Sequence, residues 1–395
     1  MLDETQAANL LGVEADELSV FDVEDRYNPG NTLAGFLCRR SDHRYGALII
    51  NQVNGVEVAP QIVWGTPKLH YPFGRTEMEE RKYHFPKAVR RVEVYEKLDG
   101  TNVLAYVYRD AMGNRFRTFK TRLTPVMLDN RFGAHSHMWE ELLQNEALRK
   151  FTDEASLGEN AFAFELYGNR NPHLVTYKDV SLSTRLLFAV SQSDATVRPA
   201  SDIKSCPEWT LTPEAVLDSP QALISFYEDK RAEAESKNTV IGEGLEKQVE
   251  GTEGFIFYTL DETGHWDLWK CKPESVETLH WAQGSIPAPV LVATAWNALE
   301  SCPDPELTPE YVRGLLLEEF TAAQVGRSDV RIGKTVAYIN NRIQFRQKVK
   351  DAYTSCGADW IVDGRAQVMR AISKSFDRKE MKKVFQALQE IGVAK

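Results

Sequence analysis

The chain has 395 residues, 43% hydrophobic and 26% charged, with a formal net charge of −10, which allows two or three globular domains and excludes disordered and fibrous chains. No apolar run approaches the ~18 residues of a membrane span, and no basic-then-apolar secretory leader opens the chain. Because the five scattered cysteines form no Cys-x-x-Cys pair, the sequence predicts an intracellular protein, cytoplasmic or nuclear, without a disulfide framework or zinc ribbon.

Residues 1–75 are predicted to form a β-rich N-terminal extension. Strand-like alternation runs through residues 37–40 and 45–50, and the Asn54-Gly55 pair is typical of a tight turn. The extension contains no recognisable catalytic or binding motif, so the sequence assigns it no role.

Residues 76–283 are predicted to form an α+β domain. Short β-rich runs separated by Gly, Asn and Asp indicate antiparallel sheets. Helical periodicity in residues 138–151 and 220–237 indicates helices packed outside them. The predicted strands cover residues 92–95, 103–108, 161–166, 186–190, 254–258 and 266–270.

Residues 284–395 are predicted to form an all-helical domain. Thr308 followed by Pro309 is typical of a helix start. Asp377, with Glu380 three residues later, is typical of a capping box before a last helix that runs to about residue 391. The fold class predicted for the chain is therefore α+β, with an antiparallel-sheet domain followed by a helical one.

The charge is unevenly distributed along the chain. Residues 331–395 contain 14 Lys and Arg but only 6 Asp and Glu, so they carry +8 and the rest of the chain carries −18. A basic end on an acidic body favours a polyanionic partner, although a solvated helical surface would have the same composition. The cations that could contact phosphates are Arg342, Arg346, Lys348 and Lys350, and further on Arg378, Lys379, Lys382 and Lys383.

The most informative segment chemically is 96–102, which reads Glu-Lys-Leu-Asp-Gly-Thr-Asn. Its lysine, Lys97, directly follows the predicted strand 92–95, and the Asp-Gly pair indicates a turn that could present the amine to a cleft. A surface lysine before such a turn is common, so this segment alone does not define a site.

Three later blocks give Lys97 its context. Glu165 lies at a predicted strand end before a glycine, and Glu253 lies just before the start of another strand. Lys270 and Lys272 are two residues apart and therefore on one face of a strand. Each block alone is compatible with a solvated strand end or an exposed sheet face. Together, in this order, they indicate a shared site.

This ordered set resembles the covalent nucleotidyltransferase superfamily of ATP-dependent ligases and mRNA capping enzymes. Residues 96–102 match the Glu-Lys-x-x-Gly-Thr-Asn motif of the RNA ligase 2 type of ATP-dependent RNA ligase, and the resemblance covers about residues 90–275. It implies that Lys97 is the nucleophile that becomes adenylylated. It also implies that ATP and Mg²⁺ or Mn²⁺ are the cofactors, and that the substrate is RNA with 5′-phosphate and 3′-hydroxyl ends.

The resemblance implies further roles around Lys97. Segment 120–124 best matches the motif that carries the family's arginine, which makes Arg122 its counterpart, and Phe188 is the candidate for stacking on adenine. Glu165 is expected near the ribose and Glu253 near the metal, and both can supply oxygen ligands.

The chemistry of lysyl adenylylation explains why lysines recur here. A free lysine amine has a pKa of ~10.4 and attacks phosphorus only when unprotonated, so nearby positive charge must favour its neutral form. Lys270, Lys272 and a metal ion would supply that charge and neutralise the α-phosphate, which makes the two lysines catalytic candidates beside Lys97. AMP would then pass to an RNA 5′-phosphate, and a 3′-hydroxyl would displace it. The residues expected to bind the nucleotide are Glu96, Asp99, Gly100, Asn102, Arg122, Glu165, Phe188, Glu253, Lys270 and Lys272.

Other interpretations remain open. An mRNA guanylyltransferase or a DNA ligase would share the nucleophile, although the sequence after Lys272 indicates helices rather than the OB-fold of those enzymes. A noncatalytic nucleic-acid-binding protein could also have this fold. His135 and His137 lack a third metal ligand at a suitable spacing, which favours structural histidines. The sequence leaves the natural RNA substrate and the oligomeric state undecided.

Overall fold

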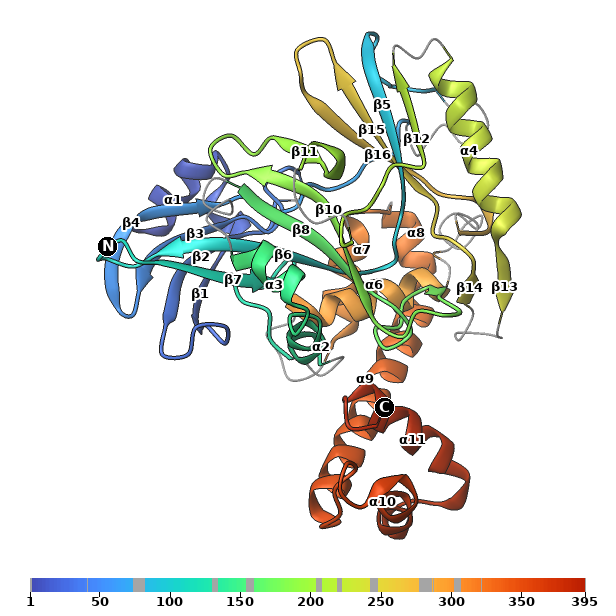
Figure 1. The fold of residues 1–395 in the computed structure, drawn as a ribbon. Coiled ribbons are helices and arrows are strands. Elements are labelled where there is room, and N and C mark those ends of the chain that lie inside the picture. The colour runs from blue at the N-terminus through green and yellow to red at the C-terminus, as the bar shows by residue number, and fades with distance from the viewer. Residues whose placement is uncertain are drawn as a thin grey trace.

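The structure, a computed structural model, describes residues 2–394 except 41, 74–81, 130–133, 154–159, 204–207, 219–221, 242–247, 277–285, 287, 302–306 and 321. Sheets form the upper part of the molecule in Figure 1, where helices α6, α7 and α8 of the C-terminal third lie among them, and the later helices continue downward into a projecting arm. Both predicted domain boundaries, near residues 75 and 283, lie outside the described residues.

The N-terminal segment is a helix packed on a four-stranded antiparallel sheet. Helix α1 (Glu4–Leu11) begins with a capping box from Asp3 and buries its apolar face on this sheet. The predicted turn is confirmed, because Asn54 and Gly55 have φ angles of 56° and 72°, the left-handed pair typical of two-residue hairpins. The strands, which pair in sequence order, are β1 (Leu18–Glu24), β2 (Thr32–Cys38), β3 (Leu48–Val53) and β4 (Val56–Val63).

Two further antiparallel sheets form the centre of the molecule, in the orders β12-β5-β15-β16 and β11-β10-β8-β6-β7. Strand β5 belongs to the first sheet and β6 to the second, so residues 97–99 connect the two. All six predicted strands are confirmed, with ends that differ by up to three residues. The strands are β5 (Val89–Glu96), β6 (Gly100–Arg109), β7 (Arg115–Lys120), β8 (Asn160–Tyr167), β10 (Ser183–Ser191), β11 (Val197–Pro199), β12 (Ala215–Asp218), β15 (Phe255–Asp261) and β16 (Trp266–Cys271). A smaller sheet contains β9 (Val175–Thr176), β13 (Thr239–Ile241) and β14 (Gln248–Glu250).

The prediction of one helix over residues 138–151 is wrong. Two helices form instead, α2 (His135–Leu142) and α3 (Glu146–Asp153). The side-chain oxygen of Asn145 accepts hydrogen bonds from the backbone N–H groups of Ala147 and Leu148 at 2.9 and 3.1 Å. This cap begins α3 and ends the continuity with α2. The predicted helix at 220–237 is confirmed as α4 (Leu223–Lys237), and its expected first residues lie outside the described part.

The C-terminal region is helical, as predicted, with Thr308 capping α7 through the N–H of Tyr311. Its apolar residues form two separate clusters, and the long helix α9 contributes to both. The second cluster holds the arm that projects downward in Figure 1. The helices are α6 (Ala288–Ser301), α7 (Pro309–Leu317), α8 (Ala322–Arg327), α9 (Asp329–Ser355), α10 (Gly364–Ile372) and α11 (Met381–Glu390).

The predicted fold class is thus confirmed, with antiparallel sheets in an α+β arrangement followed by a helical region. The capping box of Asp377 and Glu380 is also confirmed, although it begins a single 3₁₀ turn that leads into α11. Within the described ranges, the helices are too short or too polar to traverse a bilayer.

Candidate active site

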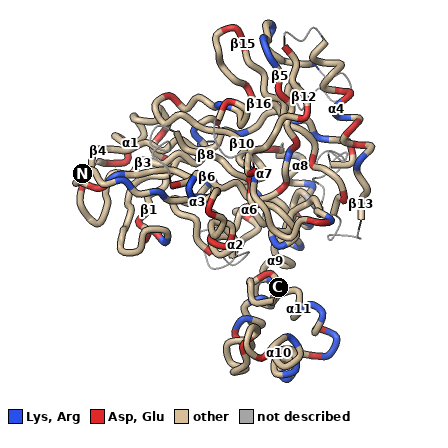
Figure 2. The backbone as a smooth tube through the Cα atoms, in the orientation of Figure 1, with Lys and Arg blue, Asp and Glu red and all other residues tan. Residues whose placement is uncertain are grey.

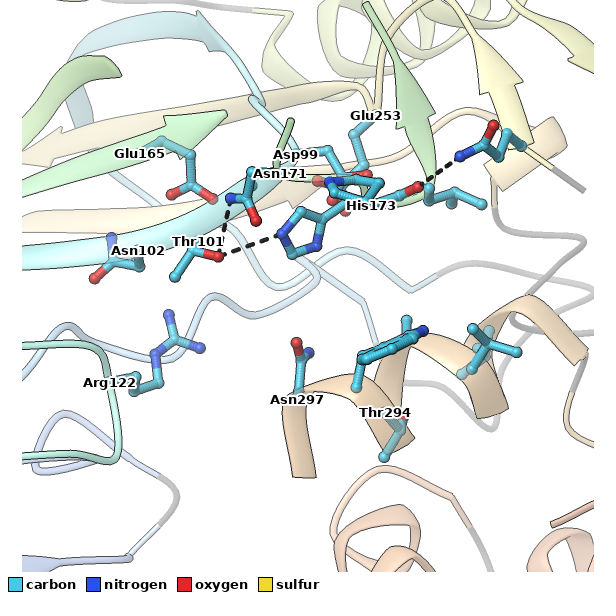
Figure 3. Close-up of a pocket in the computed structure, with 18 of the residues that line it drawn as sticks. Asp99, Thr101, Asn102, Arg122, Glu165, Asn171, His173, Glu253, Thr294 and Asn297 are labelled. Carbon is cyan, nitrogen blue, oxygen red and sulfur yellow. Dashed lines mark hydrogen bonds between the residues drawn. The ribbon is translucent and has the colours of Figure 1, made fainter. Parts of the chain in front are cut away.

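A cavity of about 1400 Å³ lies where the ends of the two central sheets face the helical region. Figure 3 shows Asp99, Glu165 and Glu253 on the sheet side, with Asn297 and Thr294 of α6 opposite. Every residue that the sequence predicts for the site lines this cavity, whereas the chemical roles of these residues remain predictions. The lining residues predicted from sequence are Glu96, Lys97, Asp99, Gly100, Asn102, Arg122, Glu165, Phe188, Glu253, Lys270 and Lys272.

The register of one sheet brings Lys97 to the cavity. Glu96, Phe255 and Cys271 form one row across β5, β15 and β16. The next residue along β5 is Lys97, whose backbone N–H donates to the carbonyl of Gly254 at 2.8 Å. The nucleophile candidate is therefore fixed by backbone hydrogen bonds beside a segment 156 residues later in the chain.

Gly254 permits this close approach of strands. Its φ of +125° is a conformation that residues with a side chain rarely adopt. A Cβ atom at this position would lie 2.1 Å from the carbonyl oxygen of Cys271, which is a severe clash with backbone. The glycine after the second predicted glutamate is therefore part of how the site is built.

Glu253 bridges two lysines. Its Oε2 atom accepts from Lys97 Nζ, and its Oε1 atom lies 2.7 Å from Lys272 Nζ. Burial alone would raise the pKa of Glu253, but the two lysines outweigh it and hold the pKa well below its usual range. Burial opposes the charge of Lys272 as well, and Glu253 nevertheless raises the pKa of Lys272. The three side chains thus form a buried ion triad with one excess positive charge.

Two more carboxyl groups lie near this triad. Burial raises the pKa of Glu165 to about 8, with Lys97 opposing the rise and Glu253 adding to it. Burial also raises the pKa of Asp99, again with a contribution from Glu253. Asp99 Oδ2 accepts from the N–H of Val175 at 2.7 Å, which fixes its direction. Burial is thus the main cause of both shifts, and the charge of Glu253 adds to each.

Three carboxylates that line this cavity, Asp99, Glu165 and Glu253, offer oxygen atoms of the kind that bind a divalent cation. The described residues contain no cluster of three or more His, Cys, Asp or Glu side chains that could chelate a metal ion by themselves. Mg²⁺ in nucleotide sites commonly uses only one or two carboxylates and takes its other oxygen ligands from phosphates and water. Glu165 and Glu253, the predicted metal ligands, are therefore compatible with an ion that arrives with a nucleotide.

The predicted lysine pair lines one cavity but its members have different surroundings. Lys272 belongs to the ion triad, whereas Lys270 Nζ lies over the ring of Tyr71 at 4.6 Å from the ring centroid. The backbone of Lys270 is fixed on both sides, since its N–H donates to His70 and its carbonyl accepts from Tyr227. Lys270 thus lines the cavity from β16, an edge strand of its sheet.

The turn after Lys97 and the strand that follows meet β8 closely. A Cβ atom on Gly100 would lie 2.2 Å from the carbonyl oxygen of Leu166, so only glycine fits here. Asn102 pairs with Glu165 across β6 and β8, and its side-chain oxygen is buried without a hydrogen-bond partner among the described residues. Burial, followed by repulsion from Glu214, raises the pKa of Glu96. At these positions the backbones of β6 and β8 lie in close contact and form part of one wall of the cavity.

Arg122 is held by the N-terminal extension, which the sequence left without a role. Its Nε donates to Thr66 Oγ1 at 3.1 Å, and its guanidinium lies over the ring of Tyr45 at 5.8 Å from the centroid. A Cβ on Gly46 would lie 2.0 Å from the Arg122 carbonyl oxygen, so the two backbones touch. The buried amine of Lys120 donates to that same carbonyl at 2.8 Å. The sequence could not reveal these contacts, because they join segments about 60 residues apart that share no motif.

Phe188 lies both in the core and on the cavity wall. It is 5% exposed and packs with the main apolar cluster of the sheets. The ladder between β10 and β8 shifts register between Leu186 and Phe188, and both Leu187 and Phe188 line the cavity. The predicted role in adenine stacking is compatible with this position, and Leu187 is a neighbour that the sequence did not indicate.

A chain of hydrogen bonds on the sheet side of the cavity was not predicted from the sequence. Asn171 is buried and donates to Thr101 Oγ1 at 3.0 Å, and the same hydroxyl lies 3.4 Å from His173 Nε2 (Figure 3). His135 lines the cavity beside them, and burial lowers its pKa to about 4. Among the described residues, neither His135 nor His137 belongs to a group of three or more His, Cys, Asp or Glu side chains that could hold a metal ion.

The predicted basic groups of the C-terminal region separate in the structure. Arg342, Arg346, Lys379 and Lys383 line the cavity. Lys348, by contrast, packs over the ring of Phe376. The remaining members of the two groups do not line the cavity; they are Lys350, Arg378 and Lys382.

Three solved structures similar to this chain are ATP-dependent ligases. An archaeal ATP-dependent RNA ligase is 15% identical, with a TM-score of 0.41 over 84% of this chain and 76% of its own. A protein from Aquifex aeolicus, provisionally described as an ATP-dependent DNA ligase, is 12% identical, with a TM-score of 0.42 over 90% and 81%. A mutant Naegleria gruberi RNA ligase with ATP and Mn is 10% identical, with a TM-score of 0.30 over 66% and 97%. No family model and no curated protein matched the chain.

The similar solved structures are thus described as RNA or DNA ligases, and all three are at most 15% identical to this chain. Because the similarity is distant, the activity of this chain has to be inferred from its own site.

Proposed function

We propose that this protein is an ATP-dependent RNA ligase that joins 5′-phosphate and 3′-hydroxyl ends through a lysyl-AMP intermediate on Lys97. The observation that carries the proposal is the buried triad of Lys97, Glu253 and Lys272 at the wall of a cavity large enough for a nucleotide and more. A nucleophilic amine, a second cation and carboxylates at one point are what phosphoryl transfer to lysine requires.

The ion triad suggests how the amine becomes reactive. In the structure Lys97 is paired with Glu253, so its amine has to leave that carboxylate before it can attack phosphorus. Lys272 holds the other oxygen of Glu253 and would keep that carboxylate in place when Lys97 leaves it. The positive charge of Lys272 would then lie near the attacked phosphate and stabilise the negative charge on its oxygens.

In the first step, Lys97 Nζ forms a bond with the α-phosphorus of ATP, and the bond from that phosphorus to the β-phosphate oxygen breaks, releasing pyrophosphate. In the second, an RNA 5′-phosphate oxygen displaces the lysine and takes AMP. In the third, a 3′-hydroxyl attacks the same 5′-phosphate, and AMP leaves with the oxygen that joined it.

Several side chains would position ATP and its metal. Glu165 and Glu253 would hold Mg²⁺ or Mn²⁺, which when bound supplies Lewis-acid charge to the phosphate oxygens. Arg122 and Lys270 would contact the phosphates, and Phe188 would contact the base. The remaining predicted contacts with the nucleotide come from Glu96, Asp99, Gly100 and Asn102.

A labelling assay tests the nucleophile. Radiolabelled ATP should leave label on the denatured wild-type protein, and GTP should not, which distinguishes the ligase from a guanylyltransferase. Lys97→Ala should abolish the label, and Lys97→Arg should as well, because a guanidinium does not act as the nucleophile. Lys178→Ala is the matched control, since Lys178 is exposed and outside the cavity. Undiminished labelling of Lys97→Ala would refute the assignment.

A sealing assay tests the choice of RNA. Nicks in matched RNA and DNA duplexes should be presented with ATP and Mg²⁺ to the same preparation. We expect sealing of the RNA strand, in line with the motif at residues 96–102 and the basic C-terminal region. Sealing of DNA alone would make the protein a DNA ligase. Binding without label from any nucleotide would favour the noncatalytic interpretation.

A further inference from the structure

Two arginines of the helical region face the same cavity as Lys97. Arg342 and Arg346 lie one helical turn apart on α9 and therefore on one face of it. Only 6% of the Arg346 side chain and 29% of the Arg342 side chain are exposed. Arginines rarely lie this deep without a defined anionic partner.

The partner in this structure is a carboxylate of the same chain. Glu390 Oε1 lies 2.7 Å from Arg342 Nη2, and Glu390 Oε2 accepts from Arg346 Nε. Each carboxylate oxygen of Glu390 thus contacts one guanidinium group. A phosphodiester group also offers two non-bridging oxygens and one negative charge, so it can make the same pair of contacts.

The two guanidinium groups are held independently of Glu390. Both lie over the ring of Trp296 on α6, at 5.6 Å for Arg342 and 5.1 Å for Arg346. Arg342 also donates to the hydroxyl of Tyr338 at 3.4 Å. Because an aromatic surface and a second donor contact orient them, the arginines can keep their geometry while the anion is exchanged.

Glu390 occupies an unfavourable place for a carboxylate. It is the last residue of α11, where the negative end of the helix dipole opposes an anion. One carboxylate also leaves two arginines with an excess positive charge. An external anion can therefore compete with Glu390 more easily than with a carboxylate at a helix start.

The neighbouring charges favour an extended polyanion over a single phosphate. Lys379 and Lys383 line the cavity from α11 and its preceding turn. Figure 2 shows that Lys and Arg gather along α11 in the projecting arm. Cations that line the cavity and continue along α11 match successive phosphates of a strand rather than the compact triphosphate of ATP.

We propose that Arg342 and Arg346 form a binding site for a backbone phosphate of the polynucleotide substrate, and that Glu390 occupies this site until the strand displaces it. The proposal rests on the proposed function and adds the route by which the strand reaches Lys97. Glu390 then acts as an internal phosphate mimic that neutralises the arginines and weakens unspecific binding.

The test measures binding of a fluorescent nicked RNA duplex with a 5′-phosphate to the full-length protein without ATP. Glu390→Gln should bind about 3- to 10-fold more tightly, since a neutral amide competes less with phosphate. Arg342→Gln should bind at least about 10-fold more weakly and lower the slope of log K against log salt by about 1. Arg342→Lys keeps the positive charge but loses the planar guanidinium group that can donate two parallel hydrogen bonds. Its affinity for RNA should therefore lie between those of Arg342→Gln and wild type.

Glu380→Gln is the matched control. Glu380 lines the same cavity, and glutamine preserves its capping box, so the same loss of negative charge occurs without release of the arginines. We expect Glu380→Gln to tighten RNA binding by less than about 2-fold, because this substitution acts on binding only through the overall charge of the protein. In an Arg342→Gln background, Glu390→Gln should lose most of its effect, because the two act on one site.

Distinct outcomes separate this proposal from the proposed function. Equal binding by Glu390→Gln and Glu380→Gln, or unweakened binding by Arg342→Gln, would overturn the phosphate site. Competition by inorganic triphosphate at the same residues would assign the arginines to ATP and also overturn it. If the wild type takes no label from ATP but shows the expected binding pattern, the function fails and the site is supported. Thermal unfolding of each variant verifies that it is folded.

Discussion

The two walls of the cavity position their charged side chains by different means. On the sheet wall, Lys97, Glu253 and Lys272 are placed by backbone register and by glycines that allow no side chain. On the helical wall, Arg342 and Arg346 are placed by helical spacing, and their anionic partner lies at a helix end. Hydrogen-bonded strand register holds a side chain at a defined position, whereas an ion pair at a helix end can exchange its partner.

This difference matches the two tasks that we propose. Chemistry at phosphorus requires groups that are preorganised before the substrate arrives, because reorganisation would add to the barrier. Capture of a strand requires contacts that tolerate many positions and sequences. The sheet wall suits the first task and the helical wall the second. The predictions below test whether the sheet wall is as rigid, and the helical wall as adaptable, as this comparison holds.

Glu253→Gln should have the largest effect. It leaves the buried Lys272 and the half-buried Lys97 beside each other without their shared counter-charge, and breaking a buried pair costs about 3–5 kcal/mol. We expect a clear fall in Tm and a loss of labelling of at least about 100-fold. A smaller fall in Tm for Glu390→Gln would support the comparison. An equal or larger fall would show that the helical wall is no more adaptable.

Gly254→Ala and Gly333→Ala contrast the backbones of the two regions. At Gly254 the new Cβ would meet the Cys271 carbonyl at 2.1 Å in a left-handed conformation, so stability should fall by about 1–3 kcal/mol and labelling with it. Gly333 lies inside α9 with open space around its Cβ position. There alanine should stabilise by about 0.5–1 kcal/mol through helix propensity. Denaturant unfolding of both variants measures the two signs, and a stabilising Gly254→Ala would contradict the register argument.

Glu165 should make stability depend on pH. Its pKa is raised by burial from 4.5 to about 8, so the folded state favours the protonated acid. That contribution is fully present below pH 4.5 and is lost as the pH rises toward about 8. The free energy of unfolding of wild type relative to Glu165→Gln should therefore decrease across this window. A constant difference between the two proteins would show that Glu165 is not buried as described.

Tyr45→Leu should have the smallest effect of the four. The ring lies under the Arg122 guanidinium, and losing it should reduce labelling several-fold, in line with about 0.5–1 kcal/mol for an exposed cation–π contact. Tyr45→Phe keeps the ring and should restore most of the rate. In an Arg122→Ala background, Tyr45→Leu should add nothing further. Additive losses would mean that the N-terminal extension supports the fold without orienting Arg122.

The parts of this site that were readable from sequence are those with a local signal. Lys97 follows a strand and precedes an Asp-Gly pair, and Lys270 and Lys272 alternate along another strand. Strand periodicity located all six predicted strands. The prediction of a single helix at 138–151 was wrong because Asn145 caps a new helix at this point. This cap is a local signal, as helical periodicity is, and here it was the stronger of the two.

The parts that were not readable depend on contacts between distant segments. Tyr45 and Thr66 carry no motif and become relevant only because the connecting segments that contain them pack against the turn of Arg122. Arg346 and Lys348 are two residues apart on one helix, yet the first enters the cavity and the second packs on Phe376. Composition cannot separate such neighbours, since a helix face is defined by what packs against it.

The sequence by itself determined the α+β class, the six predicted strands and the eleven predicted residues that line the cavity, because each follows from short-range periodicity or from a motif. Only the tertiary structure decided that Glu253 bridges Lys97 and Lys272, that the N-terminal extension holds Arg122, and that Glu390 holds two arginines opposite them. The physical reason is that charge pairing and burial act through space and require the chain to be folded before they exist.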